Sequence, residues 1–297
     1  MKKREDIIAI VGPTASGKSD LALNLAKKKD AYILSVDSLA VYKYIDIVSA
    51  KPSKEELEEV KHFGVDLLEP NEKFDVVAFL NEYKRAKKLA KSSGKSLIIV
   101  GGTSFYLKVL TKGISKMPHI SSSIREEVEE ILSNLDRAYS NLKKIDLEYA
   151  NSISSSDRYR IQKAYEIYLA SNLRPSIYFK NNPPKPIEPN LPIYEIAINK
   201  ESLREKIALR TKKMLDLGLI NEVAFLEHKY TRAPNSMKSI GIKETLDYLD
   251  GKLNLKELET KIITNTARLA KRQITFNKSQ LDITFSGSKE EIANLLL

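Results

Sequence analysis

Residues 12–19, GPTASGKS, follow the apolar run IIAIV of residues 7–11 and match every fixed position of the phosphate-loop pattern G-x-x-x-x-G-K-[ST]. The next residues, DLALNLA, space their apolar side chains as an amphipathic helix does. A strand, a glycine-rich turn and a helix in this order direct backbone N–H groups toward an anion. Lys18 adds a point charge, and Ser19 can hold Mg²⁺ or a phosphate oxygen. The stretch predicts a phosphate site and leaves open which phosphates it binds.

Further strand and helix patterns follow this loop. Residues 31–38 and 95–104 contain short apolar runs, and residues 74–94 between them form an amphipathic helix closed by a glycine. Residues 192–198 return to a strand pattern. We therefore expect the α/β class, with a P-loop NTPase-like parallel sheet and helices on both faces. The strand ends at residues 12–19, 37–38 and 101–103 should converge on one ligand site.

The composition changes in the middle of the chain. No glycine occurs between Gly113 and Gly218, and the first part of this stretch is strongly helical, with its last helix predicted to start near Asp157 and to end before Pro175. Residues 181–192 then contain five prolines, which indicates an extended segment. We expect a first part of the core at residues 1–117, an inserted helical domain at 118–177, and completion of the core with basic helices at 178–297.

Composition narrows the chemistry. The chain has 49 Lys and Arg against 39 Asp and Glu, a net charge of +10, which favours a polyanionic partner. It has no cysteine, so thiol catalysis, a cysteine zinc finger and a disulfide framework are excluded. No apolar run is long enough to span a membrane. With no export signal, we expect a cytoplasmic protein. Three single histidines do not form a metal-binding pattern.

Two charged residues stand out against their surroundings. The strand LIIVGGT lacks the carboxylate with which P-loop NTPases usually organise Mg²⁺, and the nearest candidate is Asp37, after a different strand. Asp37 is a metal ligand, a general base or a loop cap. Arg210 interrupts an apolar helical stripe formed by Leu203, Ile207, Met214 and Leu217. It either points inward to clamp a phosphate or extends to the edge of the stripe.

Three basic patches are candidates for nucleic-acid contact. Arg268, Lys271 and Arg272 share one helix face. In the helical insertion, basic residues alternate with tyrosines around Tyr159, a combination that suits splayed RNA bases. Lys238 and Lys243 flank a glycine turn. A charge run of this kind is otherwise a solvated helix face.

Seven motifs in order resemble the tRNA dimethylallyltransferase family, also called tRNA isopentenyltransferases: GPTASGKS, SVDSLAVYK, DIVSAKP, LIIVGGTSFYLK, DRYRIQKAYEIY, SIGIKE and TARLAKRQITF. The resemblance covers residues 7–278 and has the features of the bacterial type, without a C-terminal zinc finger. It implies transfer of the dimethylallyl group from dimethylallyl diphosphate to the exocyclic N6 amine of the adenine 3′ to the anticodon. The expected products are N6-dimethylallyladenosine, in tRNAs that read codons starting with U, and diphosphate.

The resemblance also implies roles for individual residues. Asp37 matches the general base and Thr103 a residue beside the adenine, and Lys18 and Arg210 join them as catalytic residues. The diphosphate-binding residues are Gly12, Pro13, Thr14, Ala15, Ser16, Gly17, Lys18, Ser19 and Arg210. The tRNA-contacting residues are Asp37, Ser38, Leu39, Ala40, Thr103, Arg125, Tyr159, Arg160, Ile161, Gln162, Lys163, Lys238, Ser239, Ile240, Gly241, Ile242, Lys243, Arg268, Lys271 and Arg272. The implied cofactor is Mg²⁺, held at Ser19.

The chain differs from the family pattern at one position of the predicted site, and several alternative functions stay open. Ala40 stands where the family often has glutamine, so a contact there is lost or replaced. The main alternative is a P-loop kinase acting on a small molecule or a nucleotide. The others are a prenyltransferase acting on free adenine nucleotides and an RNA-binding NTPase. The anticodon stem-loop of tRNA and dimethylallyl diphosphate are the expected partners, and nothing in the sequence requires more than a monomer.

Overall fold

The computed structural model describes residues 6–297 and has two compact units, Met1–Thr111 with Glu188–Leu297, and Lys112–Ile187. The first unit contains a six-stranded sheet in which every neighbouring pair is parallel. From edge to edge its strands are β3 (His62–Phe63), β2 (Ala31–Ser35), β4 (Ser96–Val100), β1 (Ile7–Val11), β5 (Ile193–Ile196) and β6 (Phe285–Gly287). The predicted parallel α/β sheet is confirmed, and β2, β4 and β1 lie side by side at its centre.

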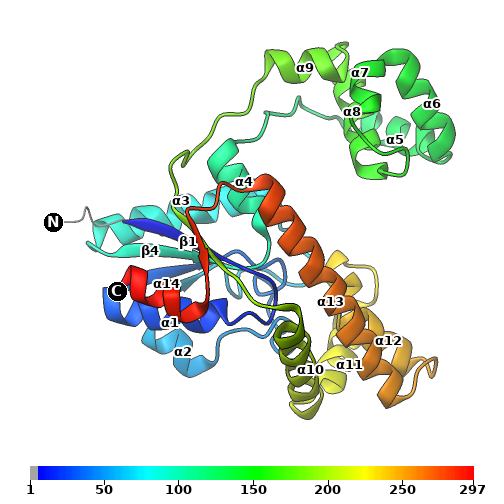
Figure 1. Ribbon diagram of the computed structural model, residues 1–297. Helices are drawn as coiled ribbons and strands as arrows, with labels where there is room; N and C mark the ends of the chain where they lie inside the picture. The colour runs from blue at the N-terminus through cyan, green and yellow to red at the C-terminus, as the bar shows by residue number, and fades with distance from the viewer. Residues whose placement is uncertain (1–5) are drawn as a thin grey trace. The chain divides into compact units, whose positions relative to one another are not determined.

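Alternate residues of each central strand face opposite sides of the sheet, so both sides carry an apolar core. Ala9 and Val11 of β1 pack under α3 (Val76–Ser92) and α4 (Ser104–Lys112). Ile8 and Ile10 pack against α1 (Lys18–Lys29) and α14 (Lys289–Leu296). Figure 1 shows α3 on one side of the strands and α1 with α14 on the other. The sequence did not predict β6 and α14, which follow the last expected helix.

A second group of helices in this unit has its own core. It comprises α10 (Lys200–Asp216), α11 (Leu219–Tyr230), the 3₁₀ turn η1 (Asn235–Lys238), α12 (Ile242–Leu249) and α13 (Leu255–Gln280), whereas the short helix α2 (Lys54–Glu59) contributes no residue to this core. Leu219, Val223 and Leu258 are fully buried here against Val41 and Ile45 of the loop that follows β2. The long helix α13 contacts both α10 and α12 (Figure 1). The loop after β2 is therefore held between the sheet and these helices.

The second unit is a bundle of five helices. They are α5 (Ser122–Ile131), α6 (Leu135–Ile145), α7 (Leu147–Asn151), α8 (Arg158–Ser171) and α9 (Pro175–Asn181). Val128, Leu142, Ile161 and Ala164 form its buried centre. As expected, α8 starts near Asp157, its N-cap residue, whose carboxylate accepts a hydrogen bond from the Arg160 N–H.

This unit is wider than the predicted insertion at residues 118–177. Pro175, which we expected to follow the last helix, occupies the first turn of α9, where its missing N–H costs no hydrogen bond. The Tyr178 hydroxyl donates to the Lys116 carbonyl and so joins the two ends of the unit.

None of the helices within residues 6–297 is both long and apolar enough to cross a lipid bilayer.

Candidate active site

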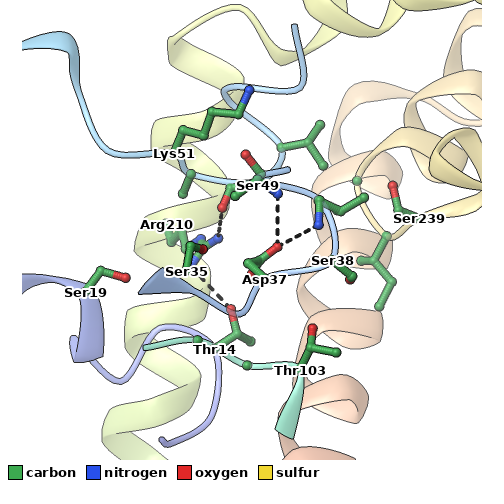
Figure 2. A pocket seen from close by; sticks show the side chains of 18 of the residues that line it. Thr14, Ser19, Ser35, Asp37, Ser38, Ser49, Lys51, Thr103, Arg210 and Ser239 are labelled. Atoms are coloured by element: carbon green, nitrogen blue, oxygen red, sulfur yellow. Dashed lines mark hydrogen bonds between the residues drawn. The ribbon is translucent and has the colours of Figure 1, made fainter. Parts of the chain in front are cut away.

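The carboxyl ends of β1, β2 and β4 open into a cleft of about 910 Å³ that lies within the first unit. All three predicted loop tips line it: Thr14, Lys18 and Ser19 from the phosphate loop, Asp37 and Ser38 after β2, and Gly101, Gly102 and Thr103 after β4. Figure 2 shows Thr14, Asp37, Thr103 and Arg210 around one space, although they come from four different elements. The expected convergence at the strand ends is confirmed, because parallel strands bring their carboxyl ends to the same edge.

Lys18 is buried at the start of α1, with 9% of its surface exposed. Its Nζ donates to the carbonyl of Pro13 at 3.2 Å and makes no ion pair with any residue in 6–297. Burial lowers the pKa of Lys18 to about 8; the Asp37 carboxylate raises it in part, and the Arg210 guanidinium lowers it. The loop bends back through Ala15 (φ 64°) and Gly17 (φ 85°), a geometry that turns amides toward an anion.

Arg210 of α10 turns into the same cleft. Its guanidinium donates to the Thr14 hydroxyl at 3.3 Å and to the Ser49 carbonyl at 3.4 Å (Figure 2). Both acceptors are neutral, and none of the described residues forms an ion pair with it. Burial lowers the pKa of Arg210, and Asp37 opposes that effect. The inward orientation is therefore observed, whereas Leu217, which we placed on the buried stripe, is 61% exposed.

Asp37 follows β2, and the two oxygens of its carboxylate have different surroundings. Its Oδ1 accepts hydrogen bonds from the N–H groups of Leu39 at 2.8 Å and Ala40 at 3.3 Å (Figure 2). The described residues give Oδ2 no hydrogen-bond partner. Asp37 thus caps its loop, as one of the alternatives held, and still presents one oxygen. A carboxylate fixed by two backbone amides is well oriented to accept a proton.

A residue that the sequence did not point to fixes the wall beside Arg210. The Glu222 carboxylate of α11 accepts hydrogen bonds of 2.7–3.0 Å from three consecutive N–H groups, those of Asp46, Ile47 and Val48. Burial raises the pKa of Glu222, and the three amides oppose this. The next carbonyl in the chain, that of Ser49, accepts from Arg210. Glu222 therefore holds the loop against which the arginine rests.

Lys51 lines the cleft but has satisfied partners. Its Nζ donates to the Tyr42 carbonyl at 2.6 Å and to the carboxylates of Asp46 at 2.5 Å and Asp66 at 2.6 Å. Its side chain is 4% exposed. Because two carboxylates already neutralise it, Lys51 closes the loop and leaves Lys18 and Arg210 to meet an anion at the phosphate loop.

The residues present fit Mg²⁺ only as an ion shared with a bound ligand. Ser19 and Asp37 line the cleft, but no group of three or more acidic or histidine side chains gathers anywhere within residues 6–297. Magnesium usually takes one or two protein oxygens together with water and substrate phosphates. The Ser19 hydroxyl, supplemented by the oxygens of a diphosphate, matches that pattern.

The predicted RNA-contacting residues fall into three places. Ser38, Leu39, Ala40, Lys238, Ser239, Ile240 and Gly241 line the cleft. Arg268, Lys271 and Arg272 are exposed on α13 outside the cleft lining, and Lys243 is exposed on α12. Arg125, Tyr159, Arg160, Ile161, Gln162 and Lys163 belong to the helical unit. The side chains of Ile161 and Ile242 are fully buried, so these two residues offer RNA no side-chain surface.

The fold and the cleft define a class: a P-loop α/β protein with one buried and one partly buried cation and one oriented carboxylate at its phosphate loop. The model of the IPP transferase family matches residues 40–280. The tRNA dimethylallyltransferase of Sulfurimonas denitrificans is 53% identical over 98% of both chains. This chain belongs to that family, the tRNA dimethylallyltransferases.

Solved structures agree with this membership. The tRNA isopentenylpyrophosphate transferase of Staphylococcus epidermidis has a TM-score of 0.69 and 30% identity, covering 98% of this chain and 96% of that one. A eukaryotic dimethylallyltransferase described as acting on tRNA has a TM-score of 0.82 and 26% identity, over 95% of this chain and 73% of that one. The enzyme is thus a transferase of a tRNA-modifying family.

Proposed function

We propose that the enzyme transfers the dimethylallyl group of dimethylallyl diphosphate to the N6 amine of the adenine 3′ to the anticodon of tRNA. One observation carries the proposal: Lys18 is buried and Arg210 partly buried at the phosphate loop, neither forms an ion pair with a described residue, and they lie near a carboxylate with one free oxygen. A buried cation is costly unless a ligand compensates it, so the cleft is suited to an anion. A diphosphate supplies that charge.

The reaction breaks the bond between the allylic carbon and the diphosphate oxygen, and the bonding electrons leave with the diphosphate. Lys18, Arg210 and the amides of the phosphate loop stabilise the charge that develops there. The adenine amine forms the new carbon–nitrogen bond and gives up a proton. Asp37 Oδ2 is the base that takes it. Mg²⁺, held by the Ser19 hydroxyl and the diphosphate, would further neutralise the leaving group.

The acceptor base has to leave its stack to reach this cleft. Thr103 lies at the cleft wall after β4, and we assign it the contact to that base. Lys238, Ser239 and Gly241 line the cleft and supply RNA-facing groups. The exposed basic residues of α13 and the helical unit offer further surfaces for the anticodon stem-loop. All cleft residues come from one chain, so a monomer suffices, and tRNA as substrate implies a cytoplasmic reaction.

The direct test incubates the purified protein with radiolabelled dimethylallyl diphosphate, Mg²⁺ and unmodified tRNA that carries adenine 3′ to the anticodon. We expect label in the tRNA and release of diphosphate. A tRNA with guanine at that position is the matched control and should stay unlabelled. Turnover of ATP without label in the tRNA would replace the proposal with a kinase or NTPase.

A further inference from the structure

Gln273 of α13 reaches into the cleft and joins two of its walls. Its side-chain oxygen accepts a hydrogen bond from the Thr14 N–H of the phosphate loop at 2.8 Å. Its side-chain nitrogen donates to the Gly102 carbonyl after β4 at 3.0 Å. An amide side chain is suited to this bridge, because it offers an acceptor and a donor at once. No carboxylate or hydrocarbon of the same length makes both bonds.

The opposite wall is shaped to receive this side chain. A Cβ placed on Gly102 would lie 2.4 Å from Nε2 of Gln273, closer than non-bonded atoms approach. Gly102 has no positive φ, so backbone conformation is not the reason for a glycine here. The same Cβ would lie 3.9 Å from the Lys18 Nζ. The missing side chain at Gly102 thus makes room for the Gln273 amide beside the catalytic lysine.

The two hydrogen bonds of Gln273 link the loop proposed to bind the diphosphate to the loop proposed to face the acceptor base. The phosphate loop carries the diphosphate, and the residue after Gly102, Thr103, faces the position of the acceptor base. Gln273 also follows Lys271 and Arg272, whose exposed side chains have no ion-pair partner among the described residues. One helix therefore carries an RNA-facing basic surface and the amide that spaces the two halves of the reaction site.

We infer that Gln273 is a positioning residue for the transfer: it sets the spacing between the phosphate loop and the loop after β4, and thereby the approach of the acceptor base to the allylic carbon. This inference rests on the proposed function. Gln273 does not touch the reacting atoms itself. Its loss lets the two loops separate, so it affects the rate at saturating substrates more than the binding of tRNA.

The experiment compares Gln273→Ala, Gly102→Ala and the double variant with the wild type, with Gln280→Ala as the control. Gln280 lies on the same helix and bonds Lys108 and Ser279 rather than the cleft. For Gln273→Ala we expect kcat to fall about ten- to a hundredfold, because small displacements of reacting groups are costly. Pyrophosphate, measured by calorimetry, should bind about two- to tenfold more weakly, as loss of one neutral hydrogen bond predicts. The Kd for tRNA and the Tm should match those of the control.

Gly102→Ala displaces the same amide, so it should reproduce the loss, and the double variant should lose no more than either single variant. Gln273→Glu keeps the size and the bond to Thr14 but repels the Gly102 carbonyl, so it should resemble Gln273→Ala. The inference is overturned if kcat of Gln273→Ala stays within about twofold of the control, or if the losses multiply in the double variant. The pyrophosphate measurement distinguishes failure of this inference from failure of the proposed function. If the wild type labels no tRNA, the proposed function is wrong. The pyrophosphate Kd of each variant still reports whether Gln273 positions the phosphate loop.

Discussion

The cleft and the helical unit place their positive charges in opposite ways. In the cleft, Lys18 is buried and Arg210 partly buried, and neither forms an ion pair with any described residue. On α8 of the helical unit, Arg158, Arg160 and Lys163 each lie beside a carboxylate, at 2.7, 3.0 and 2.6 Å. The two regions have the same residue types, yet only the cleft keeps its cations largely out of solvent with no carboxylate within ion-pair distance. Burial without a partner is what marks a ligand site.

The free-energy contributions of the unpaired cations in the cleft and of the paired cations on α8 differ in magnitude. Removing an ion from water without a partner costs several kcal/mol, which a bound anion repays. Exposed pairs contribute about 0–1 kcal/mol each, and they can exchange one anionic partner for another. Charge changes in the cleft should therefore alter chemistry by orders of magnitude. Changes on α8 should alter RNA affinity by small factors.

The largest effect is expected at the carboxylate that faces the two cations. Asp37→Asn keeps an oxygen for the Leu39 and Ala40 amides but cannot take a proton, so prenyl transfer should fall by about 10²- to 10⁴-fold. Asp37→Ala should abolish transfer. Binding of tRNA, measured by filter retention, should stay close to that of the wild type in both variants.

Asp30→Asn is the control for this experiment. Asp30 lies at the end of α1 and pairs with Lys95 at 2.5 Å, outside the cleft. Its variant should transfer at the wild-type rate. If Asp37→Asn retained more than about a tenth of the activity, general-base catalysis by this residue would be excluded, because such catalysis contributes at least about 10²-fold.

Arg210→Ala should produce the next largest effect. The guanidinium lies at the phosphate loop without an ion pair among the described residues, and removing one charged donor from a developing anion typically costs about 10²- to 10³-fold. We expect a raised KM for dimethylallyl diphosphate, a lower kcat and weaker pyrophosphate binding. Arg204→Ala removes an exposed arginine from the same helix and serves as the control. Equal losses in the two variants would show that α10, and not the clamp, had been disturbed.

The motifs that carry chemistry were predictable because they are local. GPTASGKS, the carboxylate after β2 and the arginine on an apolar stripe each stand out within a few residues, and the parallel sheet follows from the alternation of strands and helices. Glu222 and Gln273 were not predictable. Glu222 resembles any acid on an amphipathic helix, and its three amide partners are more than 170 residues away in the chain. Positioning residues are defined by their partners, and single-chain patterns do not reveal those.

The boundaries of the helical unit show a second limit. The five prolines indicated an extended segment, and residues 183–186 have no regular secondary structure. Pro175 was interpreted as a helix stop, yet it begins α9, because a proline fits the first turn of a helix as well as the position after one. Strand β6 has only three residues, one of them a glycine, so no periodicity marks it. Short elements held by tertiary contacts escape pattern analysis.

The Lys18 site should show a smaller, pH-dependent effect. Burial lowers the pKa of Lys18 to about 8, below its ordinary value of 10.5. Between these values the folded protein binds fewer protons than the unfolded chain, so the stability of the ligand-free protein rises with pH in that window. An anion favours the charged amine, so above pH 8 its binding must take up a proton. Pyrophosphate affinity should then weaken by up to about tenfold per pH unit.

Calorimetry of pyrophosphate binding between pH 7 and 9.5 measures this dependence. Lys18→Arg keeps its charge throughout and reports the titration of the ligand itself, so the difference between the two proteins isolates Lys18. A pH dependence shared by both proteins would mean that Lys18 stays charged over the whole range.

The smallest effect is expected on α8, where the two arginines, Arg158 and Arg160, are exposed and paired. Arg160 lies at the first turn of this helix beside Tyr159, which is 67% exposed. If Arg160 exchanges Asp157 for an RNA phosphate, Arg160→Ala should raise the Kd for tRNA a few-fold. It should also lower the slope of log K against log salt by about 1, with kcat unchanged. Arg137→Ala, an exposed arginine on α6 of the same unit, is the control. A slope that stayed at the wild-type value in Arg160→Ala would show that the α8 charges are only solvated pairs, and would confine RNA recognition to the unit that contains the cleft.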